Sequence, residues 1–138
     1  MILVINTAHN ENIFLGLWDK KWLEKNEWST GHNLTAEIMD KIAGLYKNTG
    51  KTYKDTTGVM VNTGPGSFTG LRIGISIANT MAYSLNIPIV GLYEIENKPE
   101  FMEKELQRLC RKKAFEKVVF PEYGKEPNIT QSKNRKSC

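Results

Sequence analysis

The residues best suited to bind a ligand or take part in a reaction lie where an apolar segment meets a glycine-rich one. Residues 64–74 contain four glycines and one proline, together with the hydroxyl groups of Ser67 and Thr69. Hydroxyl donors and the backbone N–H groups at the start of a helix can hold a phosphate or another anion. The same residues can instead make a tight turn in which Ser67 caps the helix. At the level of the sequence both interpretations are open.

An anion site here would be formed by the turn and by the end of the first apolar segment. Its candidate ligands are Asn6, Thr7, Gly64, Gly66, Ser67 and Thr69. The sequence excludes a Walker A loop, because no Lys-Ser or Lys-Thr pair follows the second glycine, and the glycine spacing does not match the dinucleotide fingerprint. The neutral amide of Asn6 lacks the charge that attracts a divalent cation. We therefore expect at most a phosphate or nucleotide site, with no metal ligands.

Elsewhere the sequence has no pattern typical of a catalytic centre. No Ser-His-Asp, Cys-His or paired-carboxylate group stands out, so no residue is assigned a catalytic role. His9 and His32 lack the close spacing of a helical metal pair. The only cysteines are Cys110 and Cys138, which indicates neither a disulfide framework nor a cysteine metal site. These observations argue against a metalloprotease.

The composition limits the chain to one domain of ordinary size. It has 138 residues, of which 40% are hydrophobic and 25% charged, as in a soluble globular protein. No apolar run approaches the roughly 20 residues that cross a bilayer, and the first residues do not resemble a signal peptide, so we expect a cytoplasmic protein. The net charge is +4, and residues 98–138 carry eleven Lys and Arg against six Asp and Glu. The basic character therefore belongs to the C-terminal segment.

The hydrophobic pattern changes from strand-like to helical along the chain. It predicts strands over 2–6, 13–18, 22–28, 58–62 and 88–92, and helices over 33–48 and 68–86. This order is typical of an α/β ribonuclease-H-like lobe, in which helices flank a mixed five-stranded sheet. We expect that lobe to span residues 1–97. Residues 98–138 are expected to form a basic helix to about Phe115 and a polar tail, disordered from Thr130 onward.

The helix predicted over 68–86 is apolar on two sides. Leu71 and Ile75 belong to one stripe, and Ile73 and Ile77 belong to a second. A glycine inside a helix costs about 1 kcal/mol relative to alanine, so the glycines of the second stripe need a reason, such as close approach of another helix. That helix can be the one over 33–48 or one from another subunit. The predicted partner-facing residues are Leu34, Ile38, Ile42, Gly70, Ile73, Gly74, Ile77 and Met81.

The sequence TGPGSFTGLRIG over residues 63–74 resembles the TsaB (YeaZ-type) family. Further matching segments are Ile5-Asn6-Thr7, Gly31-His32-Asn33, Val90-Gly91-Leu92 and the Pro-x-Tyr pattern within 120–127. The resemblance covers residues 1 to about 96. Family members usually carry a second actin-like lobe, whereas this chain has only the segment 97–116 in its place. We therefore expect a short form that lacks most of the second lobe.

The resemblance implies an ASKHA lobe, of the actin/Hsp70 type, that acts as a non-catalytic scaffold. In the family, this scaffold serves the synthesis of N6-threonylcarbamoyladenosine (t6A) in tRNA, binds the catalytic subunit TsaD, helps to recruit TsaE and forms homodimers. ATP and magnesium are then expected at the partner subunits, with no cofactor on this chain, and tRNA is reached only through the complex.

Two other interpretations stay open. The first is a nucleotide-binding ASKHA-type enzyme whose phosphate site is the turn at 64–69. The second is direct contact between tRNA and the basic segment 108–117, because a Lys and Arg excess attracts phosphates.

Overall fold

Three apolar segments at the start of the chain form an antiparallel meander. In the computed structural model, which describes residues 1–31, 33–94, 99–112 and 119–120, they are β1 (Ile2–Asn6), β2 (Ile13–Trp18) and β3 (Trp22–Trp28). Every residue of β1 and β2 is buried, so their continuous apolar sequences fit strands covered on both faces. β3 mixes half-buried and exposed residues because it forms an edge of the sheet.

Two further strands extend the sheet on the other side of β1. β4 (Gly58–Gly64) runs parallel to β1, with Val4 opposite Met60, and β5 (Ile89–Tyr93) runs parallel to β4. The strand order is β3-β2-β1-β4-β5. This confirms the predicted mixed five-stranded sheet of the ribonuclease-H-like type.

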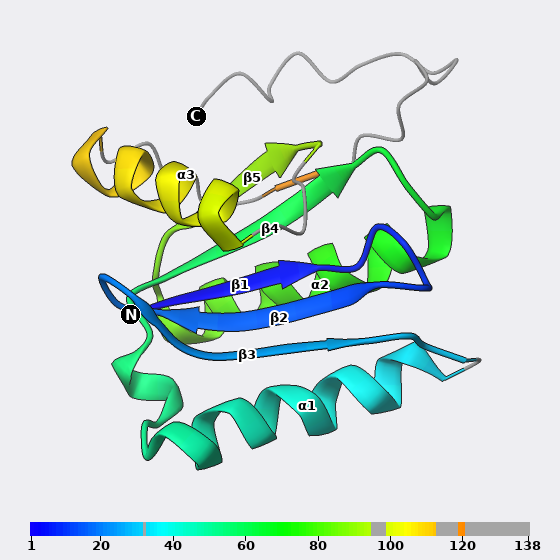
Figure 1. Ribbon diagram of the computed structural model, residues 1–138, viewed down its shortest axis with the longest axis horizontal. Coiled ribbons are helices and arrows are strands. Elements are labelled where there is room, and N and C mark those ends of the chain that lie inside the picture. The colour runs from blue at the N-terminus through cyan, green and yellow to red at the C-terminus, as the bar shows by residue number, and fades with distance from the viewer. Residues whose placement is uncertain (32, 95–98, 113–118, 121–138) are drawn as a thin grey trace.

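Two helices cover one face of the sheet (Figure 1). α1 (Leu34–Thr49) ends at Gly50, whose φ of +70° suits glycine. α2 (Phe68–Leu85) begins after Ser67, whose side chain caps it. Both helices bury their apolar stripes against the odd-numbered residues of β1, such as Leu3 and Ile5. This core fixes both helices relative to the ends of β1 and β4.

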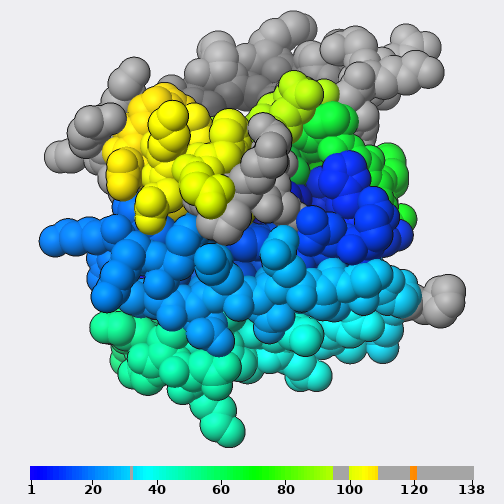
Figure 2. Space-filling model, viewed as in Figure 1, coloured from blue at the N-terminus to red at the C-terminus, as the bar shows by residue number. Residues whose placement is uncertain are grey.

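A third helix, α3 (Pro99–Lys112), packs on the opposite face. Its buried residues Met102 and Leu106 share a core with Phe14 and Met60, and Trp18 Nε1 donates a hydrogen bond to Glu103 Oε2 at 3.3 Å. In Figure 1 this helix, in yellow, lies across the strands on the side away from α2, and Figure 2 shows it on the surface of the viewed face. No helix in the described ranges is long and apolar enough to cross a membrane.

The structure differs from the predicted elements in a few places. β4 continues two residues beyond the predicted end, through Thr63 to Gly64. A short 3-10 helix, η1 (Tyr53–Asp55), lies between α1 and β4 and had no clear signal in the sequence. The predicted end of the basic helix near Phe115 and the predicted disorder of 130–138 fall outside the described residues. The same holds for residues 121–127 of the Pro-x-Tyr segment.

Candidate functional site

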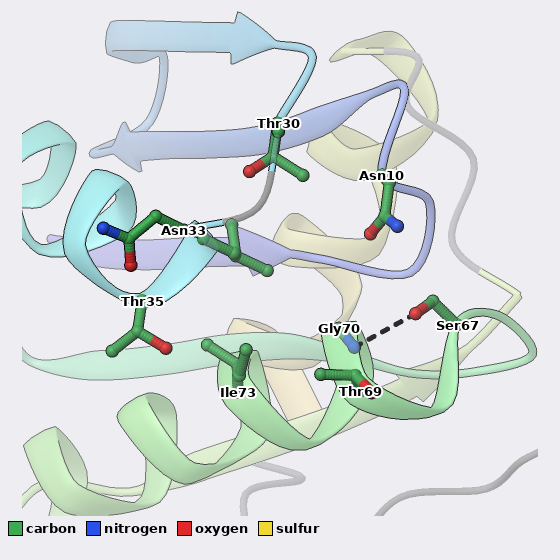
Figure 3. A pocket seen from close by; sticks show the side chains of 10 residues that line it. Asn10, Thr30, Asn33, Thr35, Ser67, Thr69, Gly70 and Ile73 are labelled. Carbon is green, nitrogen blue, oxygen red and sulfur yellow. Dashed lines mark hydrogen bonds between the residues drawn. The ribbon is translucent and has the colours of Figure 1, made fainter.

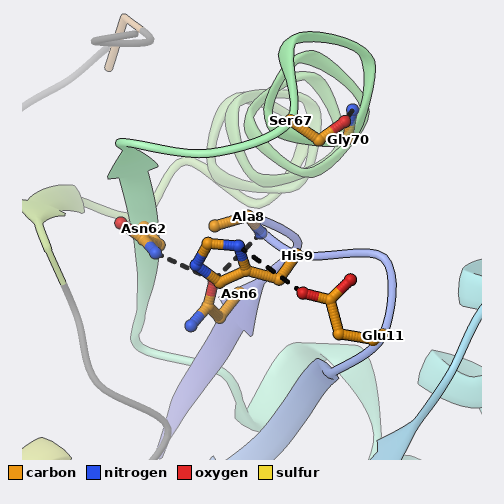
Figure 4. A network of polar contacts seen from close by, with 7 residues as sticks. All are labelled: Asn6, Ala8, His9, Glu11, Asn62, Ser67 and Gly70. Carbon is orange, nitrogen blue, oxygen red and sulfur yellow. Dashed lines mark hydrogen bonds and ion pairs between the residues drawn. The ribbon is translucent and has the colours of Figure 1, made fainter. Parts of the chain in front are cut away.

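The first candidate residues meet where β1 and β4 end. Because these strands are parallel, their carboxyl ends lie at the same edge of the sheet, where open α/β sheets commonly bind ligands. Asn62 Nδ2 donates to Asn6 Oδ1 at 2.9 Å, and the N–H of Ala8 donates to the same oxygen at 3.1 Å (Figure 4). The N–H of Gly64 donates to Asn62 Oδ1 at 3.0 Å. Both asparagines are buried, so a neutral amide pair joins the two strand ends.

The turn after β4 is bonded to the segment after β1. The N–H of Ser67 donates to the carbonyl oxygen of Ala8 at 2.7 Å. The hydroxyl of Ser67 accepts from the N–H of Gly70 at 3.1 Å, and the hydroxyl of Thr7 donates to the carbonyl oxygen of Gly70 at 2.6 Å. Two donors that an anion would need, the N–H of Ser67 and the hydroxyl of Thr7, are therefore partnered within the chain.

Two glycines of the turn are required by its backbone. Gly64 has a φ of +132°, which lies in the region that side chains rarely adopt. A Cβ added at Gly66 would lie 2.4 Å from the carbonyl oxygen of Ala8. The glycines thus permit a sharp turn and a close backbone contact, which is the structural interpretation of this motif.

The six predicted phosphate ligands lie at the same end of the sheet, and their hydrogen bonds run to neighbouring residues such as Asn62, Ala8 and Gly70. Of the six, only Thr69 is exposed. The side chains of His9 and Glu11, which follow β1, are mostly exposed, with 4.0 Å between Nδ1 and Oε1 (Figure 4). Among the described residues, no group of three or more His, Cys, Asp and Glu side chains is placed to hold a metal. The geometry therefore favours a structural role for the turn, which is to position α2, and does not favour a preformed phosphate site.

A hollow of about 150 Å³ lies between the first turns of α1 and α2 (Figure 3). Its lining combines amide and hydroxyl side chains with two aliphatic ones and carries no ionised group. The lining residues are Asn10, Thr30, Gly31, Asn33, Leu34, Thr35, Ser67, Thr69, Gly70 and Ile73. Sequence reasoning missed this hollow, because its residues come from three separate segments of the chain.

The structure corrects part of the predicted partner face. Leu34, Ile38 and Ile42 are at most 7% exposed, because they face the sheet of their own chain. Gly70 and Gly74 are also buried, and they face Thr7 at the end of β1. These five residues therefore belong to the core of this chain and do not present a surface to another subunit.

The other three predicted residues, Ile73, Ile77 and Met81, are only partly buried. They follow one another at intervals of four and so form one strip along α2. On α1, Thr35, Met39 and Ala43 are exposed and have the same spacing. Since Thr35 lines the same hollow as Ile73, this strip lies on the side of α1 that is nearer α2. We call Met39, Ala43, Ile73, Ile77 and Met81 together the α1–α2 face.

The opposite side of α1 is fixed to β3 by Glu37. Its Oε1 accepts hydrogen bonds from Thr30 Oγ1 at 2.6 Å and from Trp28 Nε1 at 3.1 Å. The Thr30 bond first, and then the Trp28 bond, lower the pKa of Glu37 from its usual value, because they stabilise the carboxylate. Lys41 lies 5.1 Å from the centre of the Trp28 ring. This latch holds the loop that forms one wall of the hollow.

The basic segment 108–117 is described only as far as Lys112. Arg108 Nη2 lies 2.9 Å from Glu105 Oε1, one helical turn earlier. This pair satisfies Arg108 within α3. The rest of the proposed tRNA contact falls outside the described residues.

The comparison with known families covers the middle of the chain. The family model described as TsaD, tRNA N6-adenosine threonylcarbamoyltransferase, matches residues 29–98. The tRNA threonylcarbamoyladenosine biosynthesis protein TsaB of Buchnera aphidicola from Schizaphis graminum is 34% identical over 92 residues, which cover 67% of this chain and 43% of that protein. TsaB of Escherichia coli is 31% identical over 91 residues, covering 66% and 39%. The chain thus spans less than half the length of these relatives.

Solved structures agree on the fold. YeaZ from Pseudomonas aeruginosa superimposes with a TM-score of 0.63 at 18% identity, over 81% of this chain and 49% of that one. A second structure, described as similar to the peptidase YeaZ from Pseudomonas aeruginosa, gives a TM-score of 0.64 at 19% identity over 80% and 47%. The sheet and its helices are therefore actin-like, of the ribonuclease-H-like type. From the family match and the curated relatives, the chain belongs to the TsaD family and, within it, to the TsaB (YeaZ) type.

Proposed function

We propose that this chain is a non-catalytic scaffold subunit in the synthesis of t6A in tRNA. Its role is to bind a TsaD-like catalytic subunit through the α1–α2 face and to help recruit a TsaE-like ATPase. Alone, it forms a homodimer through the same face. ATP and magnesium are held by the partner subunits, tRNA is contacted only through the complex, and the assembly works in the cytoplasm.

The α1–α2 face is the observation that supports this proposal. Met39 is 50% exposed, and Ile73, Ile77 and Met81 lie partly open beside it. Methionine is common at surfaces that bind helices, because its flexible side chain adapts to the partner. Two adjacent helices with an open apolar strip can pair with two helices of another subunit. The names of the TsaB relatives describe them as tRNA threonylcarbamoyladenosine biosynthesis proteins, which supports the same assignment.

Co-expression of the full chain with TsaD-like and TsaE-like proteins tests the proposal. We expect the chain to co-elute with the TsaD-like protein in size-exclusion chromatography, and t6A formation to depend on the chain. The chain alone should elute as a dimer. Failure to bind the TsaD-like protein, with t6A formed equally well without the chain, would refute the scaffold role.

Calorimetry of the isolated chain with ATP and magnesium separates the scaffold from a nucleotide-binding enzyme. We expect no micromolar binding, because the Thr7 hydroxyl already donates to Gly70 and the N–H of Ser67 already donates to Ala8. Micromolar affinity would instead favour the enzyme interpretation, with its phosphate site at residues 64–69.

A further inference from the structure

A side-chain amide of α2 holds the backbone of a distant residue. Asn79 Oδ1 accepts a hydrogen bond from the N–H of Val119 at 3.0 Å, and Asn79 Nδ2 donates to the carbonyl oxygen of Val119 at 2.9 Å. The two bonds satisfy both backbone polar groups of one residue, as a neighbouring strand would. Since both bonds go to the backbone, Asn79 recognises an extended segment without reading its side chain.

A matching hollow receives the side chain of Val119. A Cβ added at Gly91 of β5 would lie 2.6 Å from Val119 Cγ1 and 2.5 Å from Thr63 Cγ2. The missing side chain of Gly91 therefore leaves the space that Val119 occupies. Val119 is only 4% exposed and joins the apolar core under α2. Thr63, Asn79 and Gly91, from β4, α2 and β5, together form what we call the Val119 socket.

We propose that the Val119 socket is a binding site for an extended peptide segment with a small aliphatic residue, and that this chain fills it with its own Val119. Asn79 supplies the backbone contacts, and the space over Gly91 selects the size of the side chain. A larger or charged side chain would not fit, because Val119 already occupies the space that a Cβ at Gly91 would need.

The contact between Val119 and its socket, which we call the clasp, lies on the opposite face of the sheet from α3. α3 packs on one face of the sheet through Met102 and Leu106, whereas Val119 is buried on the face that α2 covers. The chain is thus held on both faces of the sheet within a short stretch of sequence. Val119 fills the space beside Gly91 of β5 and so extends the core on this face. This inference does not depend on the proposed t6A role.

Amide hydrogen exchange in the full chain tests the clasp. We expect the Val119 amide to be protected in the wild-type chain, and Asn79→Leu to reduce that protection by about tenfold or more, because both backbone bonds are lost. Thr80→Leu, at the next and exposed position of α2, is the matched control and should leave the protection unchanged. Amides of Ala78 and Ala82, buried in the core, report whether each variant is folded.

A peptide added in trans tests the site itself. Val119→Asp should vacate the socket, since a carboxylate cannot replace the isopropyl group in an apolar space. A synthetic peptide with the sequence of residues 116–124 should then bind this variant and shift the side-chain amide signal of Asn79. It should not bind the double variant Val119→Asp/Asn79→Leu.

Three results would overturn the proposal. One is an unprotected Val119 amide in the wild-type chain, and another is full protection in Asn79→Leu. The third is protection that rises with protein concentration, which would show that the occupant comes from a second copy.

Discussion

At the scale of single residues, Thr7 determines how closely α2 lies against the sheet. A Cβ added at Gly70 would lie 2.5 Å from the carbonyl oxygen of Thr7, and one added at Gly74 would lie 2.2 Å from Thr7 Oγ1. The Thr7 hydroxyl donates to the carbonyl oxygen of Gly70. The two glycines therefore let the first turns of the helix contact the end of β1 directly.

Gly74→Ala should destabilise the fold by about 1 to 3 kcal/mol, because the new methyl group overlaps Thr7 and no flexible chain end can yield. This outcome opposes the gain of about 1 kcal/mol that alanine gives in a helix interior. Gly44→Ala in α1 is the matched control: nothing lies within 4 Å of its added Cβ, so it should stabilise the protein. Urea unfolding measures the change in the free energy of unfolding for both variants. A stabilising Gly74→Ala would contradict the close contact with Thr7.

The sequence showed that glycines four apart need a close neighbour, but not which neighbour. The spacing along a helix is local, whereas the contact with Thr7 joins residues more than sixty positions apart. The helix partner expected for Gly70 and Gly74 was for that reason misplaced. The Asn6 and Asn62 amide pair was likewise invisible, since it depends on the register of two parallel strands. Replacing Gly74 by a bulky residue would disturb its contact with Thr7, so a loss of partner binding in such a variant could come from a changed fold.

At the scale of elements, two polar contacts fix α1. At its start, Glu37 bonds to Thr30 and Trp28, and the pKa of Glu37 is lowered from 4.5 because both bonds favour the carboxylate. Any stability from this latch is present above pH 4.5 and is lost as the pH falls through the lowered pKa. At its end, Tyr46 and Thr56 share a hydrogen bond between buried side chains.

Thr30→Ala should move the pKa of Glu37 back toward 4.5, because the Thr30 hydroxyl is the largest cause of the shift. Carboxyl carbon NMR over a pH titration measures this. Thr35→Ala, an exposed neighbour on α1, is the control and should leave the Glu37 titration in place. An unchanged Glu37 pKa in Thr30→Ala would contradict the claim that the Thr30 hydroxyl stabilises the Glu37 carboxylate.

Tyr46 should make the fold sensitive to alkali. Burial raises the pKa of Tyr46 above 10.0, against the opposing effect of its bond to Thr56. A raised pKa means that the neutral phenol is favoured in the folded state, so stability is retained below pH 10 and lost as the pH rises past it. Tyr46→Phe should flatten this loss in urea unfolding between pH 8 and pH 11. Tyr53→Phe, at an exposed ring that lies 4.6 Å from the Tyr46 ring at a tilt of 53°, should retain it, because burial of Tyr46 is the largest cause of its raised pKa.

Hydrophobic periodicity predicted the existence and order of the strands and of α1 and α2. It worked because β1 and β2 are continuously apolar and the helices repeat their buried residues every three to four positions. It missed the end of β4, since Thr63 and Gly64 are typical of turns, and Gly64 is held in the strand by pairing with Tyr93 of β5 across a register shift at Thr63. η1 was missed because a helix of three residues is too short to show hydrophobic periodicity.

At the scale of the whole molecule, α2 contacts β1, β4, β5 and α1. Its buried side packs on the sheet, its first turn is bonded to the end of β1, and one flank holds Val119 through Asn79. The remaining flank, with Ile73, Ile77 and Met81, is the part of the α1–α2 face that α2 supplies. This division predicts that substitutions on the two flanks have separate effects.

The affinity of the full chain for a TsaD-like partner, measured by calorimetry on two α2 variants, tests the central claim most directly. Ile77→Glu places a charge in the α1–α2 face and should weaken binding by at least about tenfold, or about 1.4 kcal/mol. Tyr83→Glu alters a side chain that is 88% exposed on the other flank, and should bind as the wild type does. Circular dichroism confirms that both variants are folded. Wild-type affinity in Ile77→Glu, or a loss confined to Tyr83→Glu, would contradict the assignment of the α1–α2 face.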